Sequence, residues 1–428
     1  MIKKVGVAIL GLGVVGGGTY QTLVEHHDFY MKTQQVDINV EAVLDLNLER
    51  LKRLGVKDEC IAKSIEEVVA NPNVDIVVET IGGIGVARTF VTAALREGKT
   101  VVTSNKELIC KYSHELEKLA KRNHCGLYYE ASCVGGVPII RTLLDGVQAN
   151  RIRSMMGIVN GTTNYILTKM TYEGADYAEV LKEAQRLGYA EANPTADVEG
   201  FDSMYKLSIL SSMAFHTKIP YTKIFREGIS HISARDIAYG KELGYTLKLL
   251  AIGKNEGNGV EVRVHPTFIP NAHPLSSVND AFNAVYLNGD AVDDIMLYGR
   301  GAGALPTASA VVSDVIYAAT HSEIKYSTFK NNATAETETK FVSDFTSAYY
   351  LRLSVDDKTG VLGKICTTFS KHGVSIVRVS QSAEVEEEGK QTVLLVTHQT
   401  KENSVKKVVE KINASGYANV RAVIRVEQ

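Results

Sequence analysis

A glycine-rich segment near the N-terminus constrains the fold of this chain more than any other feature. Gly11-Leu12-Gly13-Val14-Val15-Gly16 follows an apolar run at 5–10, which predicts a buried strand, and opens a pattern that predicts a helix to about His26. In dinucleotide-binding folds a strand, a tight glycine turn and a helix follow one another in this way, and the N–H groups at the helix N-terminus receive a pyrophosphate. The alternative to a dinucleotide site is a glycine-rich turn that binds no ligand.

Short apolar runs alternate with amphipathic ones through the first third of the chain. The expected strands are 38–44, 76–78, 101–103 and 127–129, and the clearest helices between them are 86–96 and 107–122. Strands flanked by helices predict a parallel sheet covered on both faces. We therefore expect residues 1–132 to form an α/β domain with a Rossmann-type parallel sheet.

The pattern changes after about residue 132. Helical patterns at 138–146, 164–171, 177–187 and 203–215 come before strand-like segments at 247–252, 260–268, 284–287 and 295–298. Helices and strands segregated in this way predict an α+β domain, which we place at 133–303. A further helix at 304–320 is expected to pack back on the first domain.

The C-terminal part has a pattern of its own. Residues 321–346 are polar and lack a sustained period, which predicts a linker. Residues 347–428 then show the order strand, helix, strand, strand, helix, strand, which is typical of a split βαβ sandwich. A chain of 428 residues is long enough for these three domains.

Composition excludes several classes of protein. The formal net charge is −2 and no basic stripe appears, so nucleic acid is not an expected partner. No apolar run approaches the ~20 residues that span a membrane, and the apolar N-terminus is interrupted by glycines, unlike a signal peptide. Five scattered cysteines with no CxxC pair indicate reduced thiols and a cytoplasmic location.

Polar residues at the ends of the expected strands are candidates for the cofactor site. Asp45 ends the second strand, where an acidic residue commonly binds the adenosine ribose, although it lies beyond the usual spacing. Arg50 and Arg53 follow and suit a 2′-phosphate, so NAD and NADP both remain open. Thr80 and Ser104 come directly after two other strands, at the sheet edge where such domains bind ligands.

Two charged groups suggest catalysis. Lys106 begins a predicted helix, where a cation opposes the helix dipole unless an anion or a function accounts for it. Further on, acidic residues crowd 188–206, and Asp202 and Lys206 share one helical face at i, i+4. Carboxylates and a lysine in this pattern can bind a substrate ammonium and transfer a proton. The alternative is a surface ion pair, but the apolar run at 207–215 favours a buried helix.

These residues carry a family resemblance. The pattern from Ala184 through Gly188-Tyr189-Ala190, Asn193-Pro194, Asp197-Val198, Gly200 and Asp202 to Lys206 resembles the signature of homoserine dehydrogenases. The segments 160–167 (NGTTNYIL) and 300–308 (RGAGALPTA) are similar to the same family, and 347–428 resembles an ACT domain. The resemblance implies NAD(P)-dependent interconversion of L-homoserine and L-aspartate 4-semialdehyde in threonine, methionine and isoleucine biosynthesis. It also implies a homodimer or homotetramer that dimerises through the catalytic domain at 133–303.

The resemblance also implies roles for individual residues. Lys206 matches the family's proton donor and acceptor, and Lys106 matches the lysine between cofactor and substrate. Asp202 is the third expected catalytic residue and matches, with Asp197, an acid that supports binding of the substrate amino group. The implied substrate residues are Glu191, Asp197, Tyr189 and Thr162. The implied cofactor residues are Gly11, Leu12, Gly13, Val14, Val15, Gly16, Asp45, Arg50, Thr80, Ser104, Lys106 and Gly303. A monovalent cation, Na⁺ or K⁺, is expected on backbone carbonyls of Glu130, Cys133, Gly135 and Val137.

Regulation and two alternatives stay open at this point. In ACT domains small amino acids bind near the loop after the first strand, here 356–362 with Gly360, so L-threonine is a candidate effector. Truncation after about Thr320 would then leave an enzyme that is active but insensitive to threonine. The alternative is that residues 347–428 only dimerise the chain, in which case threonine would not inhibit. The alternatives are another reductase of the aspartate-derived pathways and a ligand sensor with an inactive dinucleotide domain.

Overall fold

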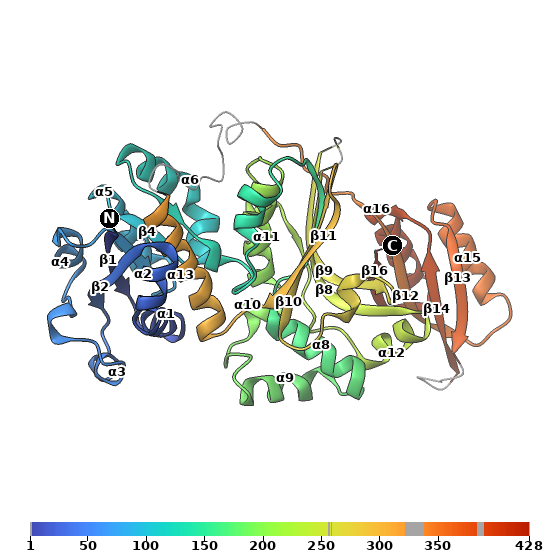
Figure 1. Ribbon diagram of the computed structural model, residues 1–428. Coiled ribbons are helices and arrows are strands. Elements are labelled where there is room, and N and C mark those ends of the chain that lie inside the picture. Colours follow the sequence, from blue (N-terminus) through green and yellow to red (C-terminus); the bar gives the residue numbers. More distant parts are fainter. Residues whose placement is uncertain (1, 256, 258, 322–337, 383–388, 428) are drawn as a thin grey trace. The chain divides into compact units, whose positions relative to one another are not determined.

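The computed structural model describes residues 2–255, 257, 259–321, 338–382 and 389–427 (Figure 1). The chain divides into two compact units. Unit 1 consists of Met1–Gly161, Asp202–Ile224 and Ala281–Thr339, and unit 2 of Thr162–Phe201, Phe225–Asp280 and Lys340–Gln428. The boundaries expected from the sequence stay a prediction. Most of the expected linker lies outside the described residues, and so does most of the acidic segment 384–389, for which the sequence predicts a turn.

A five-stranded parallel sheet forms the N-terminal part of unit 1. Its strands are β1 (Lys3–Leu10), β2 (Val36–Leu44), β3 (Ile76–Glu79), β4 (Thr100–Thr103) and β5 (Leu127–Tyr128), in the order β2-β1-β3-β4-β5. β1 pairs in parallel with both β2 and β3, so the strand order reverses between β1 and β3. Ligands of such sheets bind at this switch point, and the predicted Rossmann-type architecture is confirmed.

Seven helices surround this sheet in the described part of the chain. They are α1 (Val14–Glu25), α2 (His27–Gln34), α3 (Leu48–Arg53), α4 (Ile65–Ala70), α5 (Gly85–Arg96), α6 (Lys106–Arg122) and α13 (Ala304–Thr320). α13 packs closely on α1, because a Cβ on Gly18 would lie 2.8 Å from the carbonyl oxygen of Ala304. Only glycine permits this approach.

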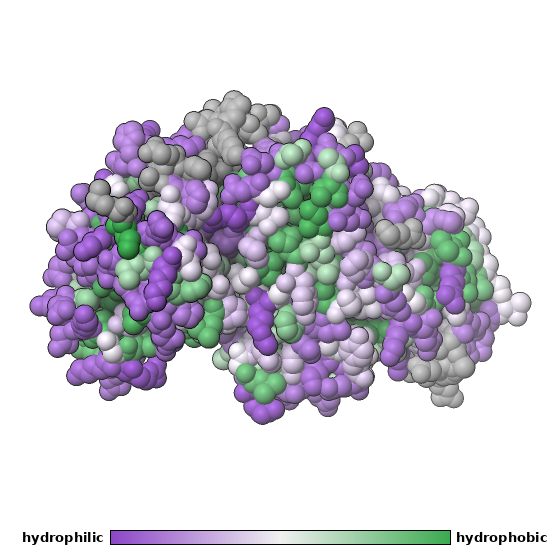
Figure 2. Space-filling view, in the orientation of Figure 1, coloured by the Kyte–Doolittle hydropathy of each residue, from purple (hydrophilic) through white to green (hydrophobic). Residues whose placement is uncertain are grey.

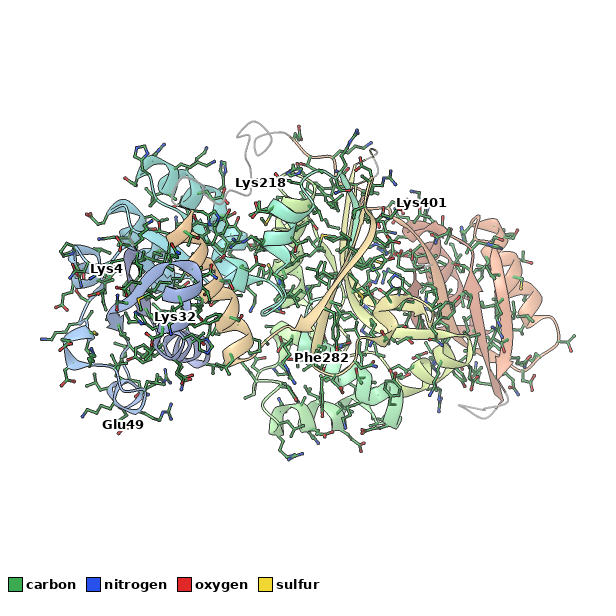
Figure 3. The ribbon with its side chains drawn as sticks, in the orientation of Figure 1. Lys4, Lys32, Glu49, Lys218, Phe282 and Lys401 are labelled. Atoms are coloured by element: carbon green, nitrogen blue, oxygen red, sulfur yellow. The ribbon has the colours of Figure 1, made fainter. Side chains whose placement is uncertain are left out.

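A second, antiparallel group of strands belongs to unit 1. β10 (Phe282–Gly289) pairs with β11 (Asp293–Arg300) on one side and with β6 (Ile152–Ile158) on the other. Hydrophobic side chains gather over β11 (Figure 2), where Tyr298 is 53% exposed. Its ring stacks on Phe282, labelled in Figure 3, with centroids 5.1 Å apart. β6 has no counterpart among the expected strands.

Unit 2 combines helices with a mixed sheet. Its main helices are α8 (Gly161–Glu173), α9 (Tyr177–Arg186), α10 (Thr195–Val198) and α12 (Ala234–Glu242), and α11 (Phe201–Ala214) leads from it into unit 1. The strands β8 (Tyr245–Asn255) and β9 (Val260–Pro270) form an antiparallel pair. Every helix and strand expected between 164 and 268 is present, and α12 is an addition.

The C-terminal region has the predicted βαββαβ order. It comprises β12 (Thr346–Asp356), α15 (Val361–Lys371), β13 (Ile376–Ser382), β14 (Lys390–Thr397), α16 (Glu402–Asn413) and β16 (Ala418–Val426). The strands lie in the order β16-β12-β14-β13. Both helices bury one face on this sheet, with Ile365, Phe369 and Ile412 fully buried.

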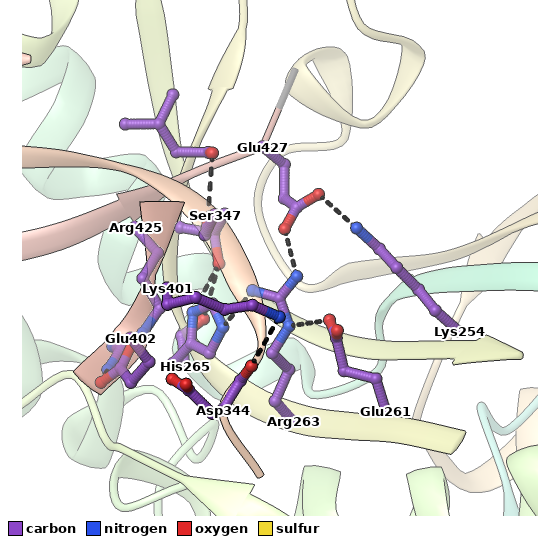
Figure 4. A network of polar contacts seen from close by, with 12 residues as sticks. Lys254, Glu261, Arg263, His265, Asp344, Ser347, Lys401, Glu402, Arg425 and Glu427 are labelled. Atoms are coloured by element: carbon purple, nitrogen blue, oxygen red, sulfur yellow. Dashed lines mark hydrogen bonds and ion pairs between the residues drawn. The ribbon is translucent and has the colours of Figure 1, made fainter. Parts of the chain in front are cut away.

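The C-terminal strand also continues the sheet of β8 and β9. β16 pairs in parallel with β9, with Arg425 opposite Thr267 and Val426 opposite Phe268. Buried charges reinforce this junction: Arg425 pairs with Glu402 at 2.7 Å, and the fully buried Arg263 pairs with Glu427 (Figure 4). Arg425 also pairs with the partly exposed Glu227 at 2.6 Å. The ACT-like region is therefore joined to β9 by strand pairing and by a buried ion pair.

No helix in the described ranges is long and apolar enough to cross a membrane. The five cysteines, Cys60, Cys110, Cys125, Cys133 and Cys366, all have free thiols. Burial raises the pKa of the Cys110 thiol to about 11, so this thiol stays protonated near neutral pH.

Candidate active site

The glycine loop between β1 and α1 has the shape that a pyrophosphate requires. Gly11 has φ +85°, and a Cβ on Gly16 would lie 1.9 Å from the carbonyl oxygen of Gly11. A Cβ on Gly13 would meet nothing within 4 Å, so the backbone there is open to a ligand. The residues present therefore fit a dinucleotide at the N-terminus of α1.

A cavity of about 480 Å³ adjoins this loop. Of the predicted cofactor residues, Gly11, Gly13, Asp45, Arg50 and Thr80 line it. Asp45 accepts hydrogen bonds from the backbone N–H of Leu12 at 2.5 Å and of Asn47 at 2.7 Å. Asp45 therefore anchors the glycine loop, and Arg50 lies 3.6 Å from its carboxylate at the cavity wall.

The strand ends near the switch point are fixed by side-chain hydrogen bonds. The Thr80 hydroxyl donates to the carbonyl oxygen of Gly11 at 2.6 Å. The buried Glu79 accepts from the Thr103 hydroxyl at 2.6 Å and from the N–H of Ile81 at 2.8 Å. Ser104 follows β4 and donates its N–H to the carbonyl oxygen of Glu79. Neither Ser104 nor Gly303, which lies before α13 with φ +124°, lines the cavity.

One buried carboxylate in unit 1 bridges two lysines. Asp202 Oδ1 lies 3.0 Å from Lys106 Nζ, and Asp202 Oδ2 lies 2.7 Å from Lys206 Nζ. The Lys206 ammonium also donates to the carbonyl oxygen of Val159 at 2.7 Å. The Lys106 side chain is 41% exposed, whereas those of Asp202 and Lys206 are 6% and 11% exposed. The cluster therefore opens toward solvent on the Lys106 side.

The charges of the cluster do not cancel. Burial opposes ionisation of Asp202, but Lys206 and Lys106, with a hydrogen bond from Asn160, outweigh it and hold the pKa of the carboxyl well below its usual range. Asn160 Nδ2 donates to Asp202 Oδ2 at 2.9 Å. Two lysines thus share one carboxylate, and with both protonated one positive charge remains to stabilise a negatively charged oxygen.

Asp202 also accounts for the position of Lys106 at the N-terminus of α6. A lysine in the first turn opposes the helix dipole, and the carboxylate 3.0 Å away offsets this. Asn105 caps the helix by accepting from the N–H of Leu108 at 3.1 Å, and its amide donates to the carbonyl oxygen of Gly83 at 2.6 Å. Neither Asn105 nor Asn160 was among the site residues expected from the sequence. Asn160 is, however, the first residue of the segment 160–167 that resembles the family.

The segment expected to hold a cation is buried and has unusual backbone angles. Val134 and Gly135 have φ of +56° and +53°, a conformation that β-branched residues rarely adopt. Burial raises the pKa of the Cys133 thiol to about 12, so a thiolate ligand is disfavoured. Among the described residues no group of His, Cys, Asp and Glu side chains is arranged to hold a metal ion. The monovalent cation that the family resemblance implies, held on backbone carbonyls of this segment, stays a prediction.

The predicted substrate residues lie in unit 2. The Thr162 hydroxyl donates to the carbonyl oxygen of Tyr189 at 2.6 Å, so the structure brings these two residues together. Glu191 follows on the same loop with its side chain exposed, and Gln185 of α9 holds its backbone carbonyl at 3.0 Å. Asp197 lies in α10.

The predicted effector loop follows β12. Gly360 has φ +86° and precedes α15, as expected for a close backbone approach. Asp356 is held by Lys390 at 2.5 Å and by Lys358 at 3.2 Å. These hydrogen bonds lower the pKa of Asp356, because they stabilise its ionised form. The carboxylate is therefore already paired with two lysines of the same region.

Comparisons with known protein families cover most of the chain. A family model described as homoserine dehydrogenase matches residues 138–316, and one described as homoserine dehydrogenase, NAD binding domain, matches residues 11–130. A model of the ACT domain matches residues 349–416.

Individual homoserine dehydrogenases are similar to this chain, two of them over its full length. A homoserine dehydrogenase of Bacillus subtilis is 40% identical over 430 residues, covering 100% of this chain and 99% of that protein. The crystal structure of a homoserine dehydrogenase from Thiobacillus denitrificans has a TM-score of 0.93 at 38% identity and covers 100% of this chain and 99% of its own. A hyperthermophilic archaeal homoserine dehydrogenase in complex with NADPH has a TM-score of 0.62 at 29% identity, over 74% of this chain and 97% of its own.

Proposed function

This chain belongs to the homoserine dehydrogenase family, and from that membership we propose which of its residues carry the reaction. The enzyme interconverts L-homoserine and L-aspartate 4-semialdehyde with a nicotinamide dinucleotide, a step of amino-acid biosynthesis. The observation that supports the assignment of catalytic residues is the bridge from Asp202 to Lys106 and Lys206.

Lys206 is the residue that moves the proton in this proposal. In oxidation a neutral Lys206 accepts the proton of the substrate hydroxyl, and in reduction the ammonium returns it to the carbonyl oxygen. Asp202 and the Val159 carbonyl fix its position. Lys106, on the exposed side of Asp202, stabilises negative charge as it develops on the same oxygen. The cofactor supplies the chemistry of hydride transfer to and from the carbinol carbon.

Residues of the glycine loop and of the adjacent cavity hold the cofactor. We assign the pyrophosphate to Gly11 through Gly16 and the adenosine to the cavity that Asp45 and Arg50 line. The guanidinium of Arg50 suits a 2′-phosphate, and both Asp45 oxygens already accept backbone N–H groups. NADP is therefore the favoured cofactor, with NAD as the alternative.

Substrate recognition is assigned to the loop that follows α9. Glu191 offers an exposed carboxylate for the homoserine ammonium, with Asp197 in support and with Thr162 and Tyr189 shaping the loop. The carbonyls of Glu130, Cys133, Gly135 and Val137 are assigned to Na⁺ or K⁺, because the left-handed backbone at 134–135 turns the segment sharply.

Regulation and assembly complete the proposal. We assign L-threonine to the loop at 356–362, since an ACT domain matches this region and Gly360 leaves its backbone accessible. The exposed apolar face of β11, with Tyr298 and Met296, is assigned to contact with a second copy in a homodimer. Free thiols in all five cysteines favour a cytoplasmic location.

One steady-state assay tests the central assignment. Homoserine-dependent reduction of NAD and NADP is measured in parallel, with and without millimolar threonine and with Na⁺, K⁺ or a bulky organic cation. We expect turnover with NADP, activation by a small alkali cation and inhibition by threonine. Absence of homoserine-dependent turnover with either cofactor would contradict the proposal.

A further inference from the structure

A fully buried lysine lies in unit 2, outside the cluster described above. Lys248 of β8 is 1% exposed. Its ammonium donates to the carbonyl oxygen of Val278 at 2.5 Å, to Asn279 Oδ1 at 3.2 Å and to Asn164 Oδ1 at 3.3 Å. These three acceptors match the three protons of a lysine ammonium, and all of them are neutral oxygens.

Placing a positive charge there is costly. The buried arginines of the same unit, such as Arg263 and Arg425, have carboxylates in direct contact, whereas the three hydrogen bonds of the Lys248 ammonium described above go to amide oxygens. Burial lowers the pKa of Lys248 to about 8, and Asp280 partly opposes this. A buried cation in such surroundings contributes little to stability by itself, so its role is to be found in the segments that the ammonium holds in place.

Lys248 joins the first turns of α8 to the loop at 278–280. Asn164 of α8 accepts from Lys248 and donates to the carbonyl oxygens of Val278 at 3.1 Å and Asp280 at 2.9 Å. The N–H of Asp280 in turn donates to the hydroxyl of Thr168, one turn further along α8, at 3.0 Å. The ammonium is therefore central to a closed network that fixes the helix start.

The same helix start carries a predicted substrate residue. Thr162 lies two residues before Asn164, and its hydroxyl holds the carbonyl oxygen of Tyr189 at 2.6 Å. Tyr189 also packs its ring on Tyr165, with centroids 4.7 Å apart. The position of the loop that carries Glu191 thus depends on where α8 begins.

We propose that Lys248 is a positioning residue for homoserine, whose ammonium fixes the start of α8 and, through Thr162, the loop of Tyr189 and Glu191. The inference rests on the proposed function, in which this loop binds the substrate. It predicts that loss of the ammonium weakens homoserine binding and leaves cofactor binding, which belongs to unit 1, unchanged.

The test compares two lysines of one strand. Lys248→Met removes the ammonium and keeps an unbranched side chain, and Lys254→Met is the matched control, because Lys254 of β8 pairs with Glu427 and not with α8. We expect KM for homoserine to rise about tenfold or more in Lys248→Met, with KM for the cofactor unchanged, and to stay within about twofold in Lys254→Met. An unchanged KM for homoserine in Lys248→Met, or a parallel rise for both substrates, would overturn the proposal.

A second measurement on the unmodified enzyme covers the case in which Lys248→Met fails to fold. The groups that face the ammonium are Asp280 in the loop and, through Asn279, the hydroxyl of Tyr172 on α8. On β9, Thr267 lies opposite Lys248, and its hydroxyl contacts the ring of His265. Burial holds the pKa of His265 well below its usual range. We expect KM for homoserine, corrected for the ionisation of its own amino group, to rise above about pH 8 as Lys248 loses its proton. A flat corrected profile would count against the proposal.

Glu191→Gln separates this inference from the assignment on which it rests. If Glu191→Gln raises KM for homoserine and Lys248→Met does not, the role of Lys248 is wrong while the substrate loop stands. If Glu191→Gln leaves KM unchanged, Glu191 is not a substrate residue, whatever the result for Lys248.

Discussion

Lys106 Nζ lies 3.0 Å from Asp202 Oδ1, a contact that links the first turn of α6 to the first turn of α11. The other oxygen of the same carboxylate holds Lys206, so both lysines take their positions from one acidic side chain. α6, which lies between β4 and β5 of the parallel sheet, is thereby tied to α11, which carries the lysine that we propose to transfer the proton. The predictions below follow from this arrangement and from the buried charges of unit 2.

Replacing either lysine by methionine should reduce turnover severely. We expect Lys206→Met and Lys106→Met each to lower kcat by about 10²- to 10⁴-fold, because each removes a charge or a proton at the reacting oxygen. Lys111→Met is a suitable control, since Lys111 lies on α6 but pairs with Glu107. Near-normal kcat in either active-site variant, measured by initial rates at saturating substrates, would contradict the assigned roles.

Asp202 should matter for stability except in acid. Its pKa in the folded state lies below that of the unfolded chain, so its contribution is fully present above about pH 4 and is lost as the pH falls through the folded-state pKa. Asp202→Asn should therefore be less stable than the unmodified protein near neutral pH, and the difference should shrink below about pH 4. Urea unfolding across this range measures the difference, and a gap independent of pH would argue against a bridging carboxylate.

Arg50 should set the preference between cofactors. Arg50→Ala removes a guanidinium from the wall of the adenosine cavity, so we expect KM for NADP to rise about tenfold while KM for NAD changes little. Arg53→Ala provides the comparison, because Arg53 does not line that cavity. Equal effects of Arg50→Ala on both cofactors would show that Arg50 does not contact a 2′-phosphate.

The C-terminal region should be needed for the stability of unit 2. Truncation after Thr320 would remove β12 and β16, leaving Arg263 without Glu427 and Asp236 without Arg352, all of them buried. From the sequence we expected that truncation leaves an active enzyme. From the structure we expect instead that the truncated protein is unstable.

A point variant tests the same junction without deleting it. Arg425→Met should lower the free energy of unfolding by roughly 3 kcal/mol, since it removes the buried cation that pairs with Glu402 and leaves that carboxylate with the Tyr349 hydroxyl and the exposed Lys406. Lys406→Met, which removes an exposed partner of the same carboxylate, should cost at most about 0.5 kcal/mol. Equal losses of stability in the two variants, measured by urea unfolding, would contradict a buried junction.

Local patterns in the sequence were sufficient to predict most of the helices and strands. The parallel strands, the βαββαβ order and the i, i+4 pair of Asp202 and Lys206 all depend on periods of two or 3.6 residues, which are visible in a short window. β6 was missed because Ile152-Arg153-Ser154-Met155 gives a weak alternation, and α2 because its eight residues are mostly polar.

Contacts between distant segments could not be predicted in this way. Nothing in the local sequence of Asn160 indicates that its amide meets Asp202, and nothing near Val426 indicates that β16 pairs with β9. Such contacts depend on the register of whole elements, which a periodic pattern does not encode. The resemblance to a family supplied candidate residues for the active site, but it gave no indication of the junction between β16 and β9.

The pairing of β16 with β9 has a consequence for how the protein is made. A ribosome releases β9 long before it reaches Glu427, so the fully buried Arg263 lacks this partner until 164 further residues have been added. The parallel sheet of unit 1, whose five strands end at Tyr128, faces no such delay. A premature stop codon within β16 should therefore yield a polypeptide with a formed parallel sheet and an unfinished second unit, a natural substrate for chaperones and proteases.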